Sequence, residues 1–209
     1  MTTDIALRRE GAAVTPYSQP MTVDELVGQV TLIQQVMARV MKSGVQYGDI
    51  PRTGDKPTLL KPGAEKLNLT FRLAPKYLVV TSTEQPDFIA FTIECELRSI
   101  ASGDLIASGM GSCSSRESKY AWRKGERICP QCGAPAIRKS KQDGGWYCWS
   151  KISGCGAKFS GQDRRIIDQT TARVANPDLW DQHNTILKMA KKRALVAAVL
   201  NGTAASDIF

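Results

Sequence analysis

Four cysteines in one segment carry the strongest chemical signal in the sequence. Cys129 and Cys132 belong to a CPQCG motif, in which the glycine gives the backbone freedom that a tight turn around a metal needs. Cys148 and Cys155 follow a basic loop and are separated by six residues. Two such pairs of thiolates can complete a tetrahedral four-sulfur shell, which leaves no open position for catalysis. The pattern predicts a structural Zn²⁺ site in a zinc ribbon over 126–160, with disulfides or free thiols as the alternative.

The start of the chain and its hydropathy favour the metal interpretation. The sequence begins MTTDIALRRE, with no apolar run after the charged residues, and it contains no run of eighteen apolar residues. We therefore expect a cytoplasmic protein with no membrane span. Reducing conditions in the cytoplasm disfavour disulfides. The remaining cysteines, Cys95 and Cys113, are isolated and are expected to pack as small core or strand residues.

Positive charge is concentrated around the cysteine segment. The chain has 28 Lys and Arg against 20 Asp and Glu, a formal net charge of +8. Residues 116–165 hold twelve of the basic and four of the acidic residues, so this segment carries the whole excess. Charge gathered on one module points to a polyanionic partner, for which nucleic acid is the leading candidate. A basic face kept for solubility is the alternative.

Aromatic residues are enriched in the same segment, which holds five of the nine Trp and Tyr residues. Bases stacked on such rings contribute about 1–3 kcal/mol each without sequence preference. Trp122 and Trp149 are the candidates for stacking. Nothing in this set reads base edges, so we expect sequence-independent binding of single-stranded DNA, with RNA left open. The candidate phosphate contacts of this segment are Lys119, Arg123, Lys124, Arg127, Arg138, Lys139 and Lys141.

Several motifs that are absent narrow the function. Neither GxxxxGK[ST] nor GxGxxG occurs, so ATP-driven strand exchange or unwinding is not expected. The one histidine, His183, is expected to be packed or exposed rather than catalytic. Glu94 and Glu96 share a strand face with Asp87 nearby, and such carboxylates could hold Mg²⁺ for phosphodiester hydrolysis. Because strand faces in water routinely carry Glu, and no lysine lies close in that strand, we expect no enzyme.

The elements that must position these residues form an α+β fold. Residues 1–20 lack periodicity and are expected to form a flexible N-terminal arm. Thr22 and Glu25 form a capping box before an amphipathic helix that reaches about Ser43. Its apolar stripe is expected to face the core or a second subunit. The stripe consists of Leu26, Val30, Ile33, Met37 and Val40.

An antiparallel β-meander is predicted after a loop and a short helix that Pro62 opens. Segments 76–83, 88–99 and 105–113 read as strands separated by EQPD and ASGD turns. The middle strand alternates strictly, so one of its faces should be core. The core members of that strand are Ile89, Phe91, Ile93, Cys95 and Leu97.

A last helix over 178–200 completes the expected main core. It places three lysines on one face, opposite an apolar face. The main nucleic-acid-binding core is thus expected to comprise 21–125 and 161–209, with the zinc ribbon as an insertion. The three lysines are Lys188, Lys191 and Lys192, and the apolar face holds Ile186, Ala190, Ala194 and Ala197.

The order of these elements resembles that of phage-type single-strand annealing proteins, the ERF, RecT and Redβ group. The similarity is strongest in ILKMAKKRALVAAVLNGTAASDIF, a basic helix followed by small residues and an aspartate. The resemblance implies ATP-independent binding and annealing of single-stranded DNA in homologous recombination, by a homo-oligomeric ring or filament in the bacterial host cytoplasm. It implies backbone contacts by Arg52, Lys56, Lys61, Lys188, Lys191, Lys192 and Arg193.

Two other functions fit the same residues. A zinc-ribbon adaptor for replication or transcription would bind nucleic acid as a monomer and would not anneal strands. A Mg²⁺-dependent nuclease would act through Glu94 and Glu96. Solution size is one discriminator, because an annealing protein of this type would form higher-order assemblies.

Overall fold

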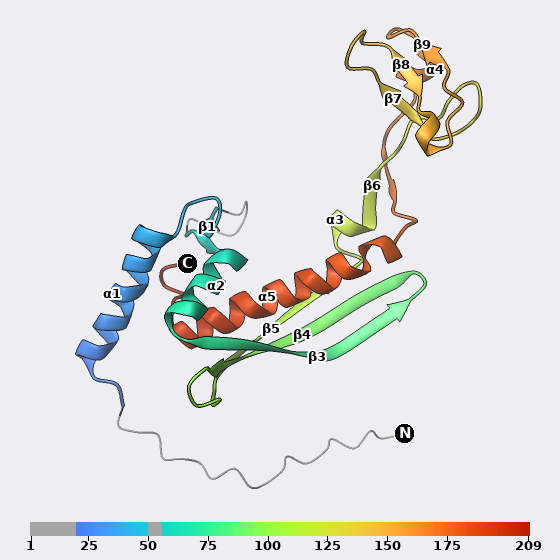
Figure 1. Cartoon of the computed structure of the whole chain (residues 1–209). Coiled ribbons are helices and arrows are strands. Elements are labelled where there is room, and N and C mark those ends of the chain that lie inside the picture. The colour runs from blue at the N-terminus through green and yellow to red at the C-terminus, as the bar shows by residue number, and fades with distance from the viewer. Residues whose placement is uncertain (1–19, 50–55) are drawn as a thin grey trace, which may run out of the picture.

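A small lobe that carries the four cysteines stands on a two-stranded stem, away from a larger lobe (Figure 1). The computed structural model describes residues 20–49 and 56–209. The expected N-terminal arm, except for its last residue, and Arg52 lie outside the described residues. Helices and antiparallel sheets are mixed along the chain, which confirms the α+β prediction.

Helix α1 (Val23–Val40) begins at the predicted capping box. The Glu25 N–H donates to Thr22 Oγ1 over 3.3 Å, and the Thr22 N–H donates to Glu25 Oε2 over 2.8 Å. The stripe was expected to face the core or a second subunit. Within this chain only Ile33 is fully buried, whereas Leu26 and Val40 are exposed. The core contacts of α1 lie in its C-terminal half, where Val36 and Met37 pack beside Ile33, and its N-terminal half extends away from the rest of the larger lobe (Figure 1).

The β-meander is confirmed and is longer than predicted. Strands β3 (Leu73–Gln85), β4 (Phe88–Ser99) and β5 (Leu105–Ser114) form one antiparallel sheet in the order β3-β4-β5. The alternation of β4 is also confirmed, since its five apolar residues from Ile89 to Leu97 are all buried. This face of the sheet forms the floor of the main core.

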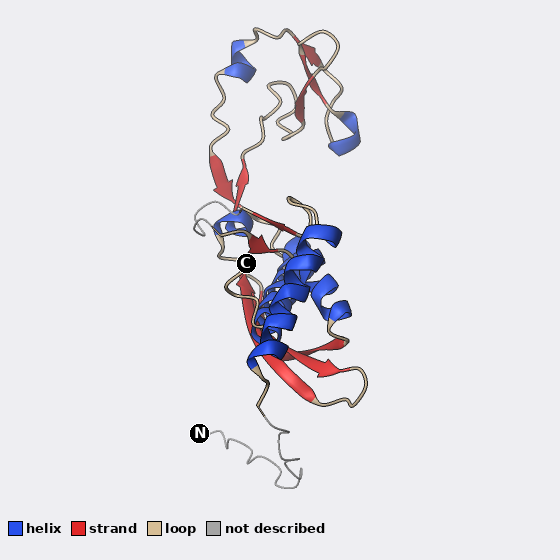
Figure 2. Ribbon diagram, turned by 90° about the vertical axis from the view of Figure 1, so that its left-hand side faces the viewer, coloured by secondary structure: helices blue, strands red, loops and turns tan. Residues whose placement is uncertain are grey.

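Helix α5 (His183–Thr203) lies across that face of the sheet (Figures 1 and 2). A 3-10 turn, η2 (Trp180–Gln182), precedes it, so the helix begins five residues later than expected. Its buried stripe passes through Ala190 and Ala194 to Ala198 rather than to the predicted Ala197. Steps of four residues keep side chains on the same face, and this face is the one that meets the sheet.

Two glycines of β5 allow α5 to touch the sheet backbone. A Cβ on Gly111 would lie 2.3 Å from the backbone N of Ala194, and one on Gly109 would lie 2.2 Å from that of Ala198. Real Cβ atoms do not approach backbone so closely, so only glycine fits at these positions. The sheet and the helix therefore meet through glycine on one side and alanine on the other.

The larger lobe also contains a two-stranded sheet and a short helix that packs against α5. Strands β1 (Tyr47–Gly48) and β2 (Thr58–Leu59) pair antiparallel, and helix α2 (Lys61–Thr70) follows with Pro62 in its first turn. Helix α2 contacts α5. The predicted short helix is therefore confirmed.

The stem consists of β6 (Trp122–Lys124) and β10 (Arg173–Ala175), which pair antiparallel after the short helix α3 (Ser118–Ala121). The small lobe has its own buried cluster, which includes Cys129, Cys148 and Ile166. None of the helices in the described ranges is long and apolar enough to cross a membrane. The elements of the small lobe are β7 (Ile137–Lys139), β8 (Trp146–Cys148), η1 (Ser150–Ile152), β9 (Lys158–Phe159) and α4 (Arg164–Ile167).

Candidate metal centre and basic groove

The four predicted cysteines meet at one point of the small lobe. Their Sγ atoms all lie within 4.8 Å of one another, and none forms a disulfide. The Cys129–Cys155 and Cys132–Cys148 Sγ pairs are 3.8 Å and 3.7 Å apart. A tetrahedral shell with metal–sulfur bonds of about 2.3 Å has sulfur–sulfur edges of about 3.8 Å. The spacing of these sulfurs thus fits a single ion held by four thiolates.

The first cysteine pair sits on a tight backbone turn. The Gly133 N–H donates to the carbonyl of Cys129 over 2.9 Å, and Gly133 has φ of 74°. The Ala134 N–H donates to Cys132, and this bond lowers the pKa of Cys132 to about 7. An N–H directed at sulfur favours the thiolate, which is the form that binds a metal.

The second cysteine pair needs a longer loop, and Gly154 makes that loop possible. The 3-10 turn η1 and Ser153, whose φ is 64°, lead the chain back past Cys148. A Cβ on Gly154 would lie 2.7 Å from Cys148 Sγ and 2.5 Å from the Trp149 carbonyl oxygen. The Cys155 N–H then donates to Cys148 Sγ over 3.3 Å. The six intervening residues therefore fold back to bring both sulfurs to one centre.

Gly154→Ala is expected to weaken metal binding, because its methyl group would displace the Cys148 sulfur or the loop that carries Cys155. We expect affinity about tenfold or more lower, as when the surroundings of metal ligands are altered. Competition with a chromophoric chelator measures this change. Ser150→Ala, at an exposed position of the same loop, is the matched control. An unchanged affinity in Gly154→Ala would contradict the packing described.

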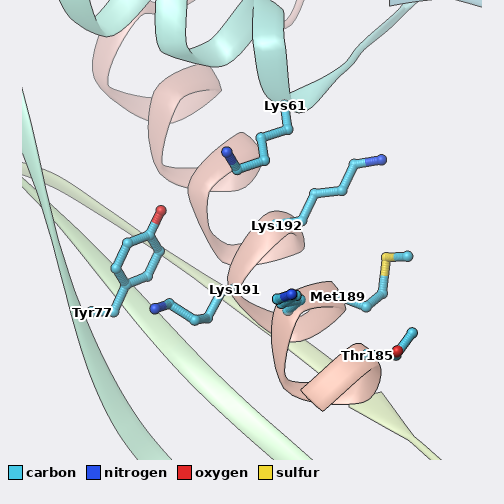
Figure 3. A pocket seen from close by; sticks show the side chains of 7 residues that line it. Lys61, Tyr77, Thr185, Met189, Lys191 and Lys192 are labelled. Carbon is cyan, nitrogen blue, oxygen red and sulfur yellow. The ribbon is translucent and has the colours of Figure 1, made fainter. Parts of the chain in front are cut away.

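A second site is a groove between α5, β3 and the start of α2 (Figure 3). Its volume is about 570 Å³. The Lys191 ammonium lies 4.5 Å from the ring centre of Tyr77, and burial raises the pKa of this tyrosine to about 12. The phenol is thus neutral at physiological pH, and its ring face holds the Lys191 cation. The groove is lined by Lys61, Tyr77, Thr185, Lys188, Met189, Lys191 and Lys192.

Three of the groove lysines keep their charge available. Within 20–49 and 56–209, no carboxylate forms an ion pair with Lys188, Lys191 or Lys192. Lys61 instead pairs with Glu65, one turn further along α2. Like charges that line one groove without counter-charges raise the local concentration of anions. Three of the predicted backbone contacts are therefore brought together, with Lys61 beside them.

Arg193 lies outside this groove, although the sequence predicted it as a backbone contact together with Lys188, Lys191 and Lys192. Its Nη2 donates to Glu117 Oε2 over 3.0 Å, and its Nη1 donates to the carbonyl of Ser112. The Arg193 guanidinium is the main cause that lowers the pKa of Glu117 to about 2. The pair therefore stays charged well into the acid range and fastens α5 to the residues that follow β5.

Basic residues of the stem are partly used within the fold. Arg123 Nη1 lies 2.6 Å from Asp178 Oδ2, and Lys119 Nζ lies 3.6 Å from Glu117 Oε2. Arg127 Nε donates to the Ile166 carbonyl over 3.0 Å. Lys124 is exposed, as is Lys56 near the loop before α2. The stem thus offers fewer free cations than its sequence predicts.

Both predicted stacking residues reach the surface. Trp122 is 48% exposed, with the Arg173 guanidinium carbon 5.9 Å from its ring centre. Trp149 is 38% exposed and lies beside the second cysteine pair. The two rings belong to different parts of the molecule, since Trp122 is in the stem and Trp149 is in the small lobe.

One of the two β4 carboxylates considered for Mg²⁺ is paired with cations of the fold. Glu96 Oε2 lies 2.8 Å from Arg98 Nη2 and 3.9 Å from Lys76 Nζ, so neighbouring cations neutralise it. Lys76 comes from the adjacent strand, which the sequence pattern of β4 alone did not reveal. In the described residues, the four cysteines are the one group of three or more His, Cys, Asp or Glu that could hold a metal.

Sequence reasoning missed three residues at these sites. Tyr77 and Met189 line the groove, and Gly154 shapes the cysteine loop. The signal for Tyr77 was its place in the strand that pairs with β4, directly opposite Cys95 and so on the face that meets α5. No family model, curated protein or solved structure matches the chain.

Proposed function

We propose that the protein binds single-stranded DNA along the basic groove and promotes annealing of complementary strands without ATP. The observation that carries the proposal is that three lysines without ion-pair partners among the described residues line one groove. Ammonium groups on flexible stems bind phosphates without reading base edges. When a strand is held only through its phosphates, its bases remain free to pair with a second strand.

We further propose that the cysteine centre holds Zn²⁺ as a structural ion. Four sulfur ligands fit Zn²⁺ or iron. The coordinated ion would link the segments of the small lobe and so stabilise its fold. The four cysteines are its ligands, and the buried cluster around Ile166 packs beside them. The lobe would then contribute exposed basic and aromatic residues without any catalytic step.

The assembly proposed is a homo-oligomer in which grooves of successive copies form one path. The exposed N-terminal half of α1 supports this assembly, because Val23, Leu26 and Val27 are apolar residues in water. Covering them with a second copy would remove apolar surface from water, at about 25 cal/mol per Å². Light scattering tests this part, and a monomer at micromolar concentration would contradict it.

The function is tested with two complementary fluorescent oligonucleotides, mixed with the protein without ATP and followed by energy transfer. We expect faster pairing than without protein. The triple variant Lys188→Ala, Lys191→Ala, Lys192→Ala should lose most of this acceleration. Its plot of log binding constant against log salt concentration should become less steep by about 2, since each lost single-strand phosphate contact accounts for roughly 0.7.

The control for this experiment is Lys42→Ala, which removes one exposed lysine that does not line the groove. It should anneal at the wild-type rate. Tight binding without acceleration would replace annealing with the zinc-ribbon adaptor, an alternative that the separate stem-borne lobe favours. Equal salt dependence in wild type and triple variant would contradict the groove as the binding site.

A further inference from the structure

Trp180, in the turn before α5, is a large aromatic residue held at the surface. Its side chain is 52% exposed. One face of its ring stacks on His183, with ring centres 5.6 Å apart and planes 12° from parallel. Among residues 20–49 and 56–209, no second ring and no cation covers Trp180. An apolar ring of this size thus presents one supported face inward and one face to water.

The support beneath Trp180 is fixed from two directions. His183 Nε2 lies 3.0 Å from Glu84 Oε2 of β3, and the His183 ring meets the edge of Phe91 with ring centres 5.2 Å apart at 89°. Phe91 is buried in the sheet. The imidazole is therefore held by both a hydrogen bond and a core residue. A ring stacked on such a base loses little conformational freedom when a ligand binds its outer face.

The turn that carries Trp180 connects the stem to the lysine groove. Two residues earlier, Asp178 pairs with Arg123 of the stem over 2.6 Å. Five residues later, Thr185 lines the groove. Lys188 lies five residues beyond His183, the residue on which Trp180 stacks, and this is about 8 Å along the axis of α5. Along the chain, Trp180 therefore lies between a residue that pairs with the stem and a residue that lines the groove.

We propose that Trp180 is a base-stacking site for single-stranded nucleic acid that leaves the groove toward the stem. This inference rests on the proposed function and adds its selectivity for unpaired bases. A duplex hides its base faces, whereas a single strand can place a base on the outer face of Trp180. Such stacking contributes about 1–3 kcal/mol per base and tolerates any sequence.

The test compares wild type, Trp180→Ala and Trp180→Phe by fluorescence anisotropy. The ligands are an oligothymidylate and an abasic phosphodiester chain of the same length. Trp180→Ala should bind the oligothymidylate about tenfold more weakly, with an unchanged salt slope, because no phosphate contact is lost. Its binding to the abasic chain should equal that of wild type. Trp180→Phe keeps a ring and should retain most of the affinity for thymidylate.

The outcomes separate this inference from the proposed function. Equal thymidylate affinities in wild type and Trp180→Ala, with binding still dependent on the three lysines, would overturn the stacking site alone. An equal loss on both ligands would also overturn it, since the abasic chain offers no base to stack. A wild-type protein that binds neither ligand would overturn both. Thermal unfolding of each variant shows that the fold is intact, as expected for an exposed residue.

Discussion

Gly111→Val is expected to destabilise the larger lobe strongly, so that it unfolds at a much lower denaturant concentration than the wild type. The Cβ alone would lie 2.3 Å from the Ala194 backbone N and 2.7 Å from the Ala190 carbonyl oxygen. Because both partners are helix backbone, no side-chain rotamer can relieve the clash, and α5 would have to leave the sheet. We expect a loss of about 4 kcal/mol or more, against a total stability of about 5–15 kcal/mol for typical domains.

Guanidinium unfolding followed by circular dichroism measures this loss. Gly28→Ala in α1 is the matched control, because a Cβ there would have nothing within 4 Å. Alanine is favoured over glycine inside a helix by about 1 kcal/mol, so this control should unfold at slightly higher denaturant. A wild-type midpoint for Gly111→Val would show that α5 does not rest on β5 as described.

Loss of the metal is expected to unfold the small lobe and leave the larger lobe folded. Segments of fewer than about 40 residues seldom fold without metals or disulfides. The buried cluster of this lobe contains two of the four cysteines, so its packing depends on the centre. Binding of a structural Zn²⁺ contributes about 10–16 kcal/mol in comparable small motifs. Cys148→Ser should therefore disorder 126–160 while α5 and the sheet keep their helical and strand signals.

Elemental analysis should give one Zn²⁺ per chain in the wild type and none in Cys148→Ser. Co²⁺ substituted into the wild type should show the absorption of a tetrahedral thiolate site. Cys113→Ala removes a thiol of the main core and should keep one metal per chain. Iron in place of zinc would correct the identity of the ion, and a metal-free wild type with a folded small lobe would contradict the prediction.

Patterns within one element predicted that element well. The alternation in β4 identified the buried face because each apolar residue of a strand faces the same side as the residue two positions away. The capping box at Thr22 likewise identified the start of α1, and the cysteine spacing predicted the sulfur cluster. In the first two cases the determining residues lie close in the sequence, whereas the cysteines, up to 26 residues apart, are recognisable by residue type.

Contacts between distant segments could not be predicted in this way. Arg193 and Glu117 are 76 residues apart, and nothing local shows that the arginine is committed to an ion pair rather than to a ligand. The exposure of Leu26 depends on where α1 docks, which its own stripe does not specify. Gly109 and Gly111 read as weak strand residues until the alanine stripe of α5 is placed against them. Contacts between these distant segments therefore could not be predicted from local sequence patterns.

The pairing of β6 with β10 brings the two ends of the small lobe side by side. Lys124 faces Arg173 across the stem, and the Gly125 N–H donates to the Ala172 carbonyl over 2.9 Å. Adjacent antiparallel strands can be joined by two residues in a tight turn. A lineage could therefore gain or lose all the intervening residues in a single genetic event, with the stem reduced to an ordinary hairpin and the register of the larger lobe unchanged.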